Sequence, residues 1–225
     1  MTQTANQNQS PLQIERRYSV EGAEVRTTAD GKPELFGYAL KWAVPYDLGW
    51  FTEEISRSAL DKADLTDVRI LFNHDANIIL GRTMAGTATV GMDDVGMWYR
   101  ATLPDSPNGE NVRIALERGD ITQSSWGFYI RQDDTGRRTG DKWEMRGTKE
   151  HRIITDVSRV VDASPVVFPA NPDTSAAKRS LDETRNEEKP QVETPDMTET
   201  YDKLSRSLKI KAAIFNNKQT QTQTS

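Results

Sequence analysis

Acyl transfer is one kind of chemistry that the reactive side chains of this chain could carry out. The 225-residue sequence has no cysteine and two histidines, so a serine hydroxyl with a histidine base is the main nucleophilic arrangement left to it. His74 ends the apolar run VRILFN, and Ser125 lies in SSWGF close to a glycine. Asp162 closes the run RIITDVSRVVD and would supply the acid that such a base needs. Taken singly, each residue also fits an ordinary structural role, such as a strand serine or a strand-end histidine.

Other kinds of site have weak support. The doublet His74-Asp75 has only His151 as a further imidazole, so we predict no metal site. No glycine-rich phosphate-binding motif occurs, and nothing singles out a carboxylate pair among the 34 acidic residues. A net charge of −5 argues against non-specific nucleic-acid binding. No apolar run reaches the ~20 residues that span a bilayer, and the start MTQTANQNQSP does not resemble a secretion signal. We therefore expect no cofactor, no nucleic-acid partner and no membrane contact.

The distribution of aromatic residues delimits the folded part of the chain. Of the 17 aromatic side chains, only Tyr201 and Phe215 lie beyond residue 172. The stretch from Asp173 to Asp202 carries nine acidic and four basic residues, and its composition is typical of a flexible segment. The predicted segments are a disordered arm (1–10), a folded domain (11–177), an acidic flexible linker (178–200), an amphipathic helix (201–216) and a disordered tail (217–225).

The helix predicted near the C-terminus has one apolar face. Tyr201, Leu204, Leu208, Ala212 and Phe215 recur at helical spacing. Two interpretations stay open: the helix packs back on the domain, or it docks on a partner.

The folded part has the pattern of a mainly β protein. Two helices are predicted, over about Glu53–Lys62 and over about Gly109–Arg118, the second capped by Ser106 or Asn108 and ended by Gly119. Asp93-Asp94 predicts a hairpin turn. Many short strands with few helices predict an α+β fold in which an antiparallel, closed or rolled β-barrel carries peripheral helices. The predicted strands cover about residues 14–27, 34–43, 68–73, 86–90, 96–103, 121–132, 141–147 and 151–161.

Five segments, in this order, resemble the prohead maturation proteases of tailed bacteriophages, whose assemblin-like fold is shared with herpesvirus capsid proteases. The resemblance runs from about Ile14 to Ala177. The last of the segments is the most specific to the family. The segments are LFGYAL, FTEEISRSAL, LFNHDANIILGR, ITQSSWGFYI and VVDASPVVFPANPDTSA.

The resemblance implies a serine endopeptidase with Ser125 as nucleophile, His74 as base and Asp162 as the third member. Relatives often have Glu at the third position, so Asp162 reaches one methylene less far. The rivals are Ser124, which the Ser-x-Gly-Phe frame disfavours, and Asp156 for the acid. His151 has no counterpart in the family pattern and is interpreted as structural.

The resemblance leaves the oxyanion donors open. Backbone N–H groups near Trp126 and Gly127 are candidates, and so is a water held by an arginine, for which Arg82 is the candidate. No cofactor is needed.

The resemblance also implies a place of action, inside the immature procapsid in the host cytoplasm. The expected substrates and partners are the scaffold protein, the major capsid protein with its scaffold-like part, and the protease itself, with self-association in the prohead. The alternative is an inert scaffold or capsid-assembly component that keeps the fold. The presence of both Ser125 and His74 favours the enzyme. A third interpretation, a cytosolic hydrolase with no capsid role, is weakly disfavoured by the acidic segment and amphipathic tail.

Overall fold

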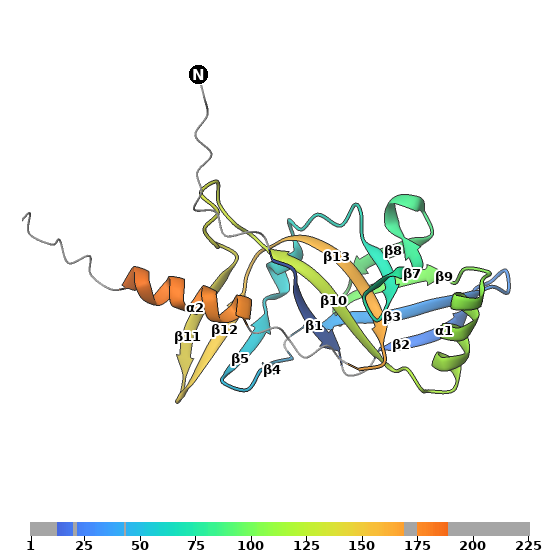
Figure 1. Cartoon of the computed structure of the whole chain (residues 1–225), viewed down its shortest axis with the longest axis horizontal. Helices are drawn as coiled ribbons and strands as arrows, with labels where there is room; N and C mark the ends of the chain where they lie inside the picture. The colour runs from blue at the N-terminus through green and yellow to red at the C-terminus, as the bar shows by residue number, and fades with distance from the viewer. Residues whose placement is uncertain (1–12, 20–21, 43, 169–174, 189–225) are drawn as a thin grey trace, which may run out of the picture. The chain divides into compact units, whose positions relative to one another are not determined.

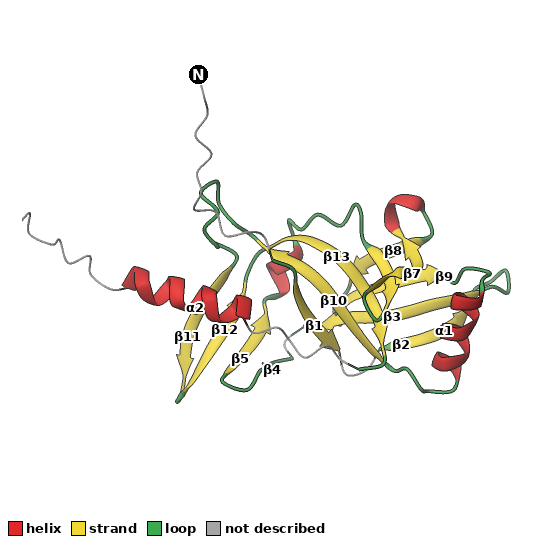
Figure 2. Ribbon diagram, in the orientation of Figure 1, coloured by secondary structure: helices red, strands yellow, loops and turns green. Residues whose placement is uncertain are grey.

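Three β-sheets make up most of the structure (Figures 1 and 2). The computed structural model describes residues 13–19, 22–42, 44–168 and 175–188. The described residues up to Asn186 belong to one compact unit. The first sheet has the order β1-β10-β13-β6-β7, and its strands are β1 (Glu15–Ser19), β10 (Gln123–Ile130), β13 (Val157–Val166), β6 (Arg69–Phe72) and β7 (Asp75–Arg82).

The other two sheets have four strands each. The second has the order β11-β12-β5-β4, with β11 (Asp141–Arg146), β12 (Lys149–Ile154), β5 (Phe51–Ile55) and β4 (Tyr46–Asp47). The third has the order β2-β3-β9-β8, with β2 (Ala23–Thr27), β3 (Pro33–Lys41), β9 (Gly96–Thr102) and β8 (Ala88–Met92). Short 3₁₀ turns lie at Arg57–Leu60 and Thr83–Ala85.

The predicted mainly β class is confirmed, whereas a closed antiparallel barrel is not. Each sheet has two free ends in its strand order within the described ranges, so no closed ring of strands forms there. The pairs β12–β5 and β13–β6 are parallel, contrary to the antiparallel prediction. The predicted hairpin at Asp93-Asp94 is confirmed, because it joins the paired strands β8 and β9.

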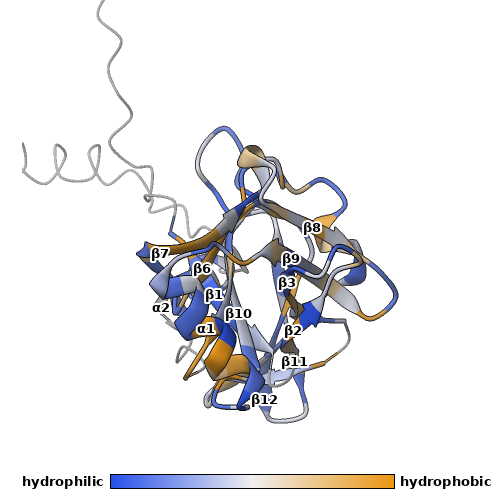
Figure 3. Ribbon diagram, turned by 90° about the vertical axis from the view of Figure 1, so that its right-hand side faces the viewer, coloured by the Kyte–Doolittle hydropathy of each residue, from blue (hydrophilic) through white to orange (hydrophobic). Residues whose placement is uncertain are grey.

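Alternating hydrophobicity explains why these segments are strands. In β3 the buried Leu35 and Ala39 lie on one face, and Tyr99 of the neighbouring β9 is also buried. The strand β10, which lies between β1 and β13, is buried along nearly its whole length, with Trp126 and Phe128 stacked in the interior. Figure 3 shows hydrophobic and polar residues interspersed along the strands and on α1.

Helix α1 (Pro107–Glu117) lies where the sequence predicts it. The Ser106 Oγ accepts a hydrogen bond from the Gly109 N–H at 3.2 Å, which caps the helix, and Gly119 follows its end with φ 78°. Local signals of this kind depend on neighbouring residues alone, which is why the prediction is confirmed.

The helix predicted over Glu53–Lys62 is wrong. Glu53 lies in β5, and the helical part is the single 3₁₀ turn at Arg57–Leu60. The Glu53 carboxylate is fully buried between arginines, and strand pairing with β12 and β4 places it there. Tertiary contacts therefore override the local helical pattern.

The linker predicted from residue 178 begins as a helix instead. Helix α2 (Ser175–Glu188) buries Ala177 and Leu181. Its Ser180 Oγ accepts a hydrogen bond from Trp143 Nε1 at 3.0 Å and donates one to Asp141 Oδ2 at 2.6 Å. These contacts hold an acidic segment that looks flexible in sequence. The predictions for 1–10, 189–200, 201–216 and 217–225 fall outside the described residues.

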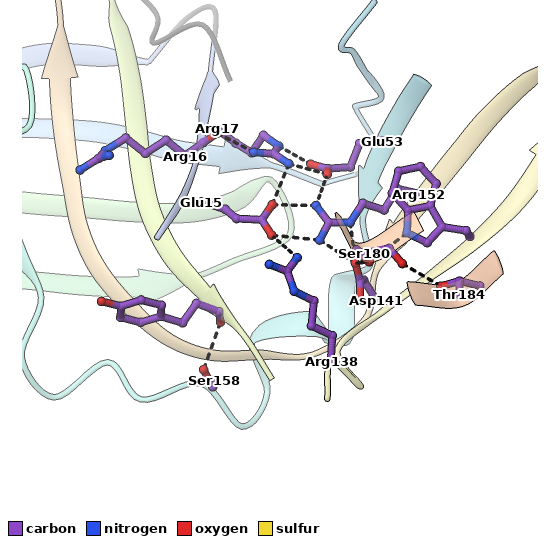
Figure 4. A network of polar contacts seen from close by, with 12 residues as sticks. Glu15, Arg16, Arg17, Glu53, Arg138, Asp141, Arg152, Ser158, Ser180 and Thr184 are labelled. Atoms are coloured by element: carbon purple, nitrogen blue, oxygen red, sulfur yellow. Dashed lines mark hydrogen bonds and ion pairs between the residues drawn. The ribbon is translucent and has the colours of Figure 1, made fainter. Parts of the chain in front are cut away.

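A buried ion network joins β1 to the second sheet (Figure 4). Arg152 Nη1 lies 2.6 Å from Glu15 Oε2 and 3.0 Å from Glu53 Oε2, and Arg152 Nε donates to Asp141 Oδ2 at 2.6 Å. Arg17 Nη2 lies 3.0 Å from Glu15 and 2.6 Å from Glu53. Burial by itself would raise the pKa of Glu15. The charge of Arg152 and its hydrogen bond, with the charges of Arg17 and Arg138, outweigh burial and lower this pKa to about 2. Glu15 therefore stays ionised at neutral pH, and its ion pairs with Arg17 and Arg152 attach β1 to the second sheet.

Removing one partner from this network is expected to destabilise the fold strongly. The change Arg152→Met leaves buried carboxylates without their shared cation, and such losses cost about 3–5 kcal/mol. The free energy of unfolding in urea measures the effect. Arg118→Met is the matched control, because Arg118 pairs with Asp120 on the surface and its side chain is 70% exposed. Equal effects of the two changes would contradict a structural role for the network.

Candidate active site

His74 lies in a tight hairpin turn between β6 and β7. Phe72 and Asp75 are paired, so Asn73 and His74 form a two-residue loop. Both have positive φ, 53° and 60°, which is the left-handed conformation required at both central positions of a type I′ turn. Asn tolerates this conformation well, whereas a histidine there is uncommon.

The hairpin turn is tied to β13. The Asn73 N–H donates to the Pro165 carbonyl at 3.0 Å, and Asn73 Oδ1 accepts from the Val167 N–H at 2.9 Å. The asparagine thus supplies both the turn conformation and the attachment. As a result, the His74 ring is held next to the two central strands of the first sheet.

Ser125 and Asp162 lie on these two strands, and His74 bridges them. His74 Nε2 is 2.7 Å from Ser125 Oγ, while Nδ1 contacts Asp162 Oδ1. The carboxylate accepts from the Nδ1–H, so Nε2 is left to accept the serine proton. All three groups are well buried: the His74 side chain is 10% exposed, that of Asp162 3%, and Ser125 is fully covered. The structure thus brings together the three residues singled out in the sequence.

Ser164 also takes part in this arrangement, and the sequence reasoning missed it. Its Oγ donates to Asp162 Oδ1 at 3.0 Å. Ser164 is opposite Ser125 in the β10–β13 register, so its side chain is on the same face. The serine of the ASPVV segment was the available signal, because alternation places it on the face of Asp162.

Gly127 makes room for the Asp162 carboxylate. It is directly opposite Asp162 in the strand register, and a Cβ added to it would lie 2.7 Å from Asp162 Oδ2 and 3.2 Å from Ile14 Cγ2. A side chain at this position would displace the carboxylate. The glycine of the Ser-x-Gly-Phe frame therefore has a steric role that the sequence reasoning did not assign.

The Ser125 hydroxyl has a second acceptor. Its Oγ is 3.0 Å from the carbonyl oxygen of Arg17 on β1, while its single proton is also within reach of His74 Nε2. No local sequence signal could have identified this contact, because it follows from pairing across strands. The Ser125 hydroxyl is thus shielded from solvent, and both His74 Nε2 and the Arg17 carbonyl lie within hydrogen-bonding distance of it.

The rival serine has a separate environment. Ser124 points to the opposite face of β10, where its Oγ lies 2.8 Å from the Tyr99 hydroxyl in the interior. It makes no contact with the His74 ring.

The rival acid Asp156 and the second histidine, His151, are also engaged elsewhere. Asp156 accepts from Arg131 Nε at 3.2 Å, and both side chains are about one-third exposed. His151 is buried, and its Nδ1 lies 2.7 Å from Thr52 Oγ1. Neither residue contacts the Ser125–His74–Asp162 group.

The candidate oxyanion donors have competing partners. Trp126 and Gly127 lie in the middle of β10, which pairs with β1 on one side and β13 on the other. Backbone N–H groups in such a strand point alternately to its two neighbours. The Arg82 guanidinium is bound by Asp67, with Nε at 2.6 Å from Oδ1 and Nη2 at 2.9 Å from Oδ2. The oxyanion role of these three residues stays a prediction.

The described part of the chain contains neither a metal-binding cluster of side chains nor a helix that could span a membrane. No group of three or more acidic and histidine side chains is placed there to hold a metal ion. Within the same ranges, no helix has the length and apolar character needed to cross a membrane.

Most of the chain matches the model of one known protein family. The family model for the caudovirus prohead serine proteases matches residues 19–187. This chain is a member of that family. The match covers most of the chain, including β10, β13 and the His74 hairpin, and confirms the resemblance stated from the sequence. The matched region ends at residue 187, close to the end of α2. It therefore extends beyond residue 177, where the sequence analysis placed the end of the folded domain.

A search of curated proteins found no match. Among solved structures, the capsid assembly protease gp21 of bacteriophage T4 is similar, with 12% sequence identity and a TM-score of 0.43. The alignment covers 69% of this chain and 99% of that one.

Proposed function

We propose that this prohead protease family member is an active serine endopeptidase in which Ser125 is the nucleophile, His74 the base and Asp162 the orienting acid. The observation that carries the proposal is the position of the His74 ring. Its Nε2 is 2.7 Å from Ser125 Oγ while its Nδ1 contacts Asp162. Such an arrangement suits transfer of the serine proton.

The proposed mechanism follows from these contacts. His74 Nε2 takes the hydroxyl proton as Ser125 Oγ attacks a peptide carbonyl, and Asp162 stabilises the imidazolium that forms. The imidazolium then gives its proton to the leaving amine. Water, deprotonated by His74, hydrolyses the acyl-enzyme and restores the serine. Ser164 contributes by fixing Asp162 Oδ1, with which it shares a 3.0 Å hydrogen bond. Backbone N–H groups at Trp126 and Gly127 are the proposed oxyanion donors. Arg82 would first have to leave Asp67.

The proposed substrates are the scaffold protein or the scaffold-like part of the major capsid protein, with the protease itself as a further substrate. Membership of the caudovirus prohead protease family supports this choice. The proposed place is the interior of the immature procapsid, where the protease would contact the capsid protein, the scaffold and further copies of itself.

An inert assembly component is the second candidate, and one observation favours it. Ser125 is fully covered, and its hydroxyl lies within hydrogen-bonding distance of the Arg17 carbonyl. A protein in this state cannot admit a substrate without a local rearrangement.

A serine-directed probe distinguishes the two candidates. Assembled proheads are treated with a fluorophosphonate, and the modified residue is located by mass spectrometry. We expect modification of Ser125, and its loss in a His74→Gln protein, because the hydroxyl reacts through its base. Processing of the capsid protein with a different serine modified would contradict the assignment. No processing and no modification would favour the inert component.

A further inference from the structure

Three arginines gather around two carboxylates at one side of the proposed active site. We call this group the Asp67 cluster; it consists of Asp64, Asp67, Arg69, Arg82 and Arg159. The Asp67 carboxylate accepts hydrogen bonds from the Arg82 guanidinium at 2.6 and 2.9 Å and from the Arg69 guanidinium at 3.2 Å. Arg159 is farther away, 3.7 Å from Asp67 and 3.9 Å from Asp64. The hydrogen bond from Arg82, with the charges of its neighbours, lowers the pKa of Asp67 to about 2.

The cluster has positive charge to spare. Within these five residues three guanidinium groups face two carboxylates, which is an excess of one positive charge. The next carboxylate, Asp162, is engaged by His74 and Ser164. The Arg159 Nε is buried and has no hydrogen-bond partner among the described residues. The side chains of Arg69, Arg82 and Arg159 are 35%, 39% and 41% exposed. The cluster can therefore accept a further anionic group from solution.

The strand register places this charge beside the catalytic acid. Asp162 is directly opposite Arg69 on β6, and Arg69 is directly opposite Arg82 on β7. Paired residues project from the same face of a sheet, and neighbouring strands are about 4.8 Å apart. The cluster thus begins one strand away from Asp162, on the face that carries Ser125.

Arg69 and Arg82 lie directly opposite each other on neighbouring strands, and the repulsion between their like charges destabilises the sheet at this point. Asp67 offsets this repulsion in part. The buried network around Glu15 differs from the Asp67 cluster, because there three arginines meet three carboxylates and the charges balance. The group with unbalanced charge is the partly exposed one near the proposed active site, and this suits it to bind an anionic ligand.

An acidic polypeptide segment is the ligand that fits this charge. Residues 187–202 of this chain contain six acidic side chains and one lysine. A nucleic acid fits less well, because the whole chain has a net charge of −5. We propose that the Asp67 cluster binds an acidic stretch of the polypeptide that is presented to the active site, and that residues 187–202 of a second copy of the chain are this stretch when one copy processes another. This proposal rests on the proposed function for its catalytic meaning, since the cluster would select what reaches Ser125.

Binding of a synthetic peptide tests the proposal without requiring catalysis. The protein is the full-length Ser125→Ala chain whose own six acidic residues in 187–202 are changed to amides, so that its own segment does not compete. The probe is a fluorescein-labelled peptide of residues 187–202, and the readout is fluorescence anisotropy at low and high salt. We expect salt-sensitive binding, which is lost when the acids of the peptide are replaced by amides.

Variants of the cluster locate the binding site. Arg159→Gln should weaken binding several-fold, and Arg69→Gln with Arg159→Gln about tenfold, because each removes a charge-assisted contact. Arg118→Gln is the matched control, since Arg118 is a similarly charged surface residue at the C-cap of α1, and should leave the Kd unchanged. Circular dichroism melting confirms that the variants are folded.

Several results would overturn the proposal. They are the absence of salt-sensitive peptide binding, equal weakening by Arg118→Gln and by the cluster variants, and tighter binding of a single-stranded oligodeoxythymidine than of the peptide. None of these results bears on the fluorophosphonate experiment, so the proposed catalytic function would stand or fall separately.

Discussion

Replacing Ser125 with alanine is expected to reduce cleavage of the proposed substrate, the capsid or scaffold protein, by a factor of ~10⁴ or more. The change removes the hydroxyl that lies 2.7 Å from His74 Nε2. The members of such a group act as a unit, so loss of the nucleophile removes nearly the whole contribution of the group. The measurement is the rate at which processed capsid protein appears in purified proheads that contain the variant.

Ser124→Ala is the matched control, because it removes the neighbouring hydroxyl from the opposite face of the same strand. Ser124 contacts the Tyr99 hydroxyl in the interior, so we expect a loss of stability of about 1 kcal/mol and nearly full processing. Full processing by the Ser125→Ala protein, or loss of processing with Ser124→Ala in a folded protein, would show that the nucleophile is assigned to the wrong residue.

The change Asp162→Asn is expected to slow processing by up to ~10⁴ while the fold is kept. Asp162 Oδ1 accepts from both the His74 ring and the Ser164 hydroxyl. An amide that turns its NH₂ group toward His74 Nδ1 favours the tautomer with the proton on Nε2. That tautomer cannot accept the proton of Ser125. The same prohead assay measures the rate, and thermal unfolding reports on the fold.

Asp156→Asn provides the control for the acid. This residue pairs with the partly exposed Arg131 and is expected to affect processing little. The reverse order of effects would mean that the third member is wrongly assigned. Asp162→Glu is a finer test, because it keeps the carboxylate and lengthens the side chain by one methylene. Near-full activity would show that the space left by Gly127 accommodates either acid.

Several features of the site are encoded in short stretches of sequence. The period of two along a strand separates Ser124 from Ser125, and the interior contact of Ser124 agrees with that separation. The Ser106 cap and Gly119 predict α1, because a helix end depends on residues within one turn. The order of the histidine, serine and aspartate segments was enough to identify the family that the family model then confirmed.

Other features depend on residues that are far apart in the chain. Glu53 belongs to a strand because Arg17 and Arg152 surround its carboxylate, and both arginines are distant in sequence. The helix α2 is held by Trp143 and Asp141, which no local pattern connects to it.

The close surroundings of Ser125 are likewise a product of strand pairing. The Arg17 carbonyl reaches the Ser125 hydroxyl only because β1 pairs with β10. Gly127 leaves room for the Asp162 carboxylate only because β13 pairs with the other side of β10. A residue's type and its near neighbours determine strand alternation, caps and motifs. The register between strands, the partners of buried charges and the accessibility of the serine follow from non-local packing, and they exist only in the folded chain.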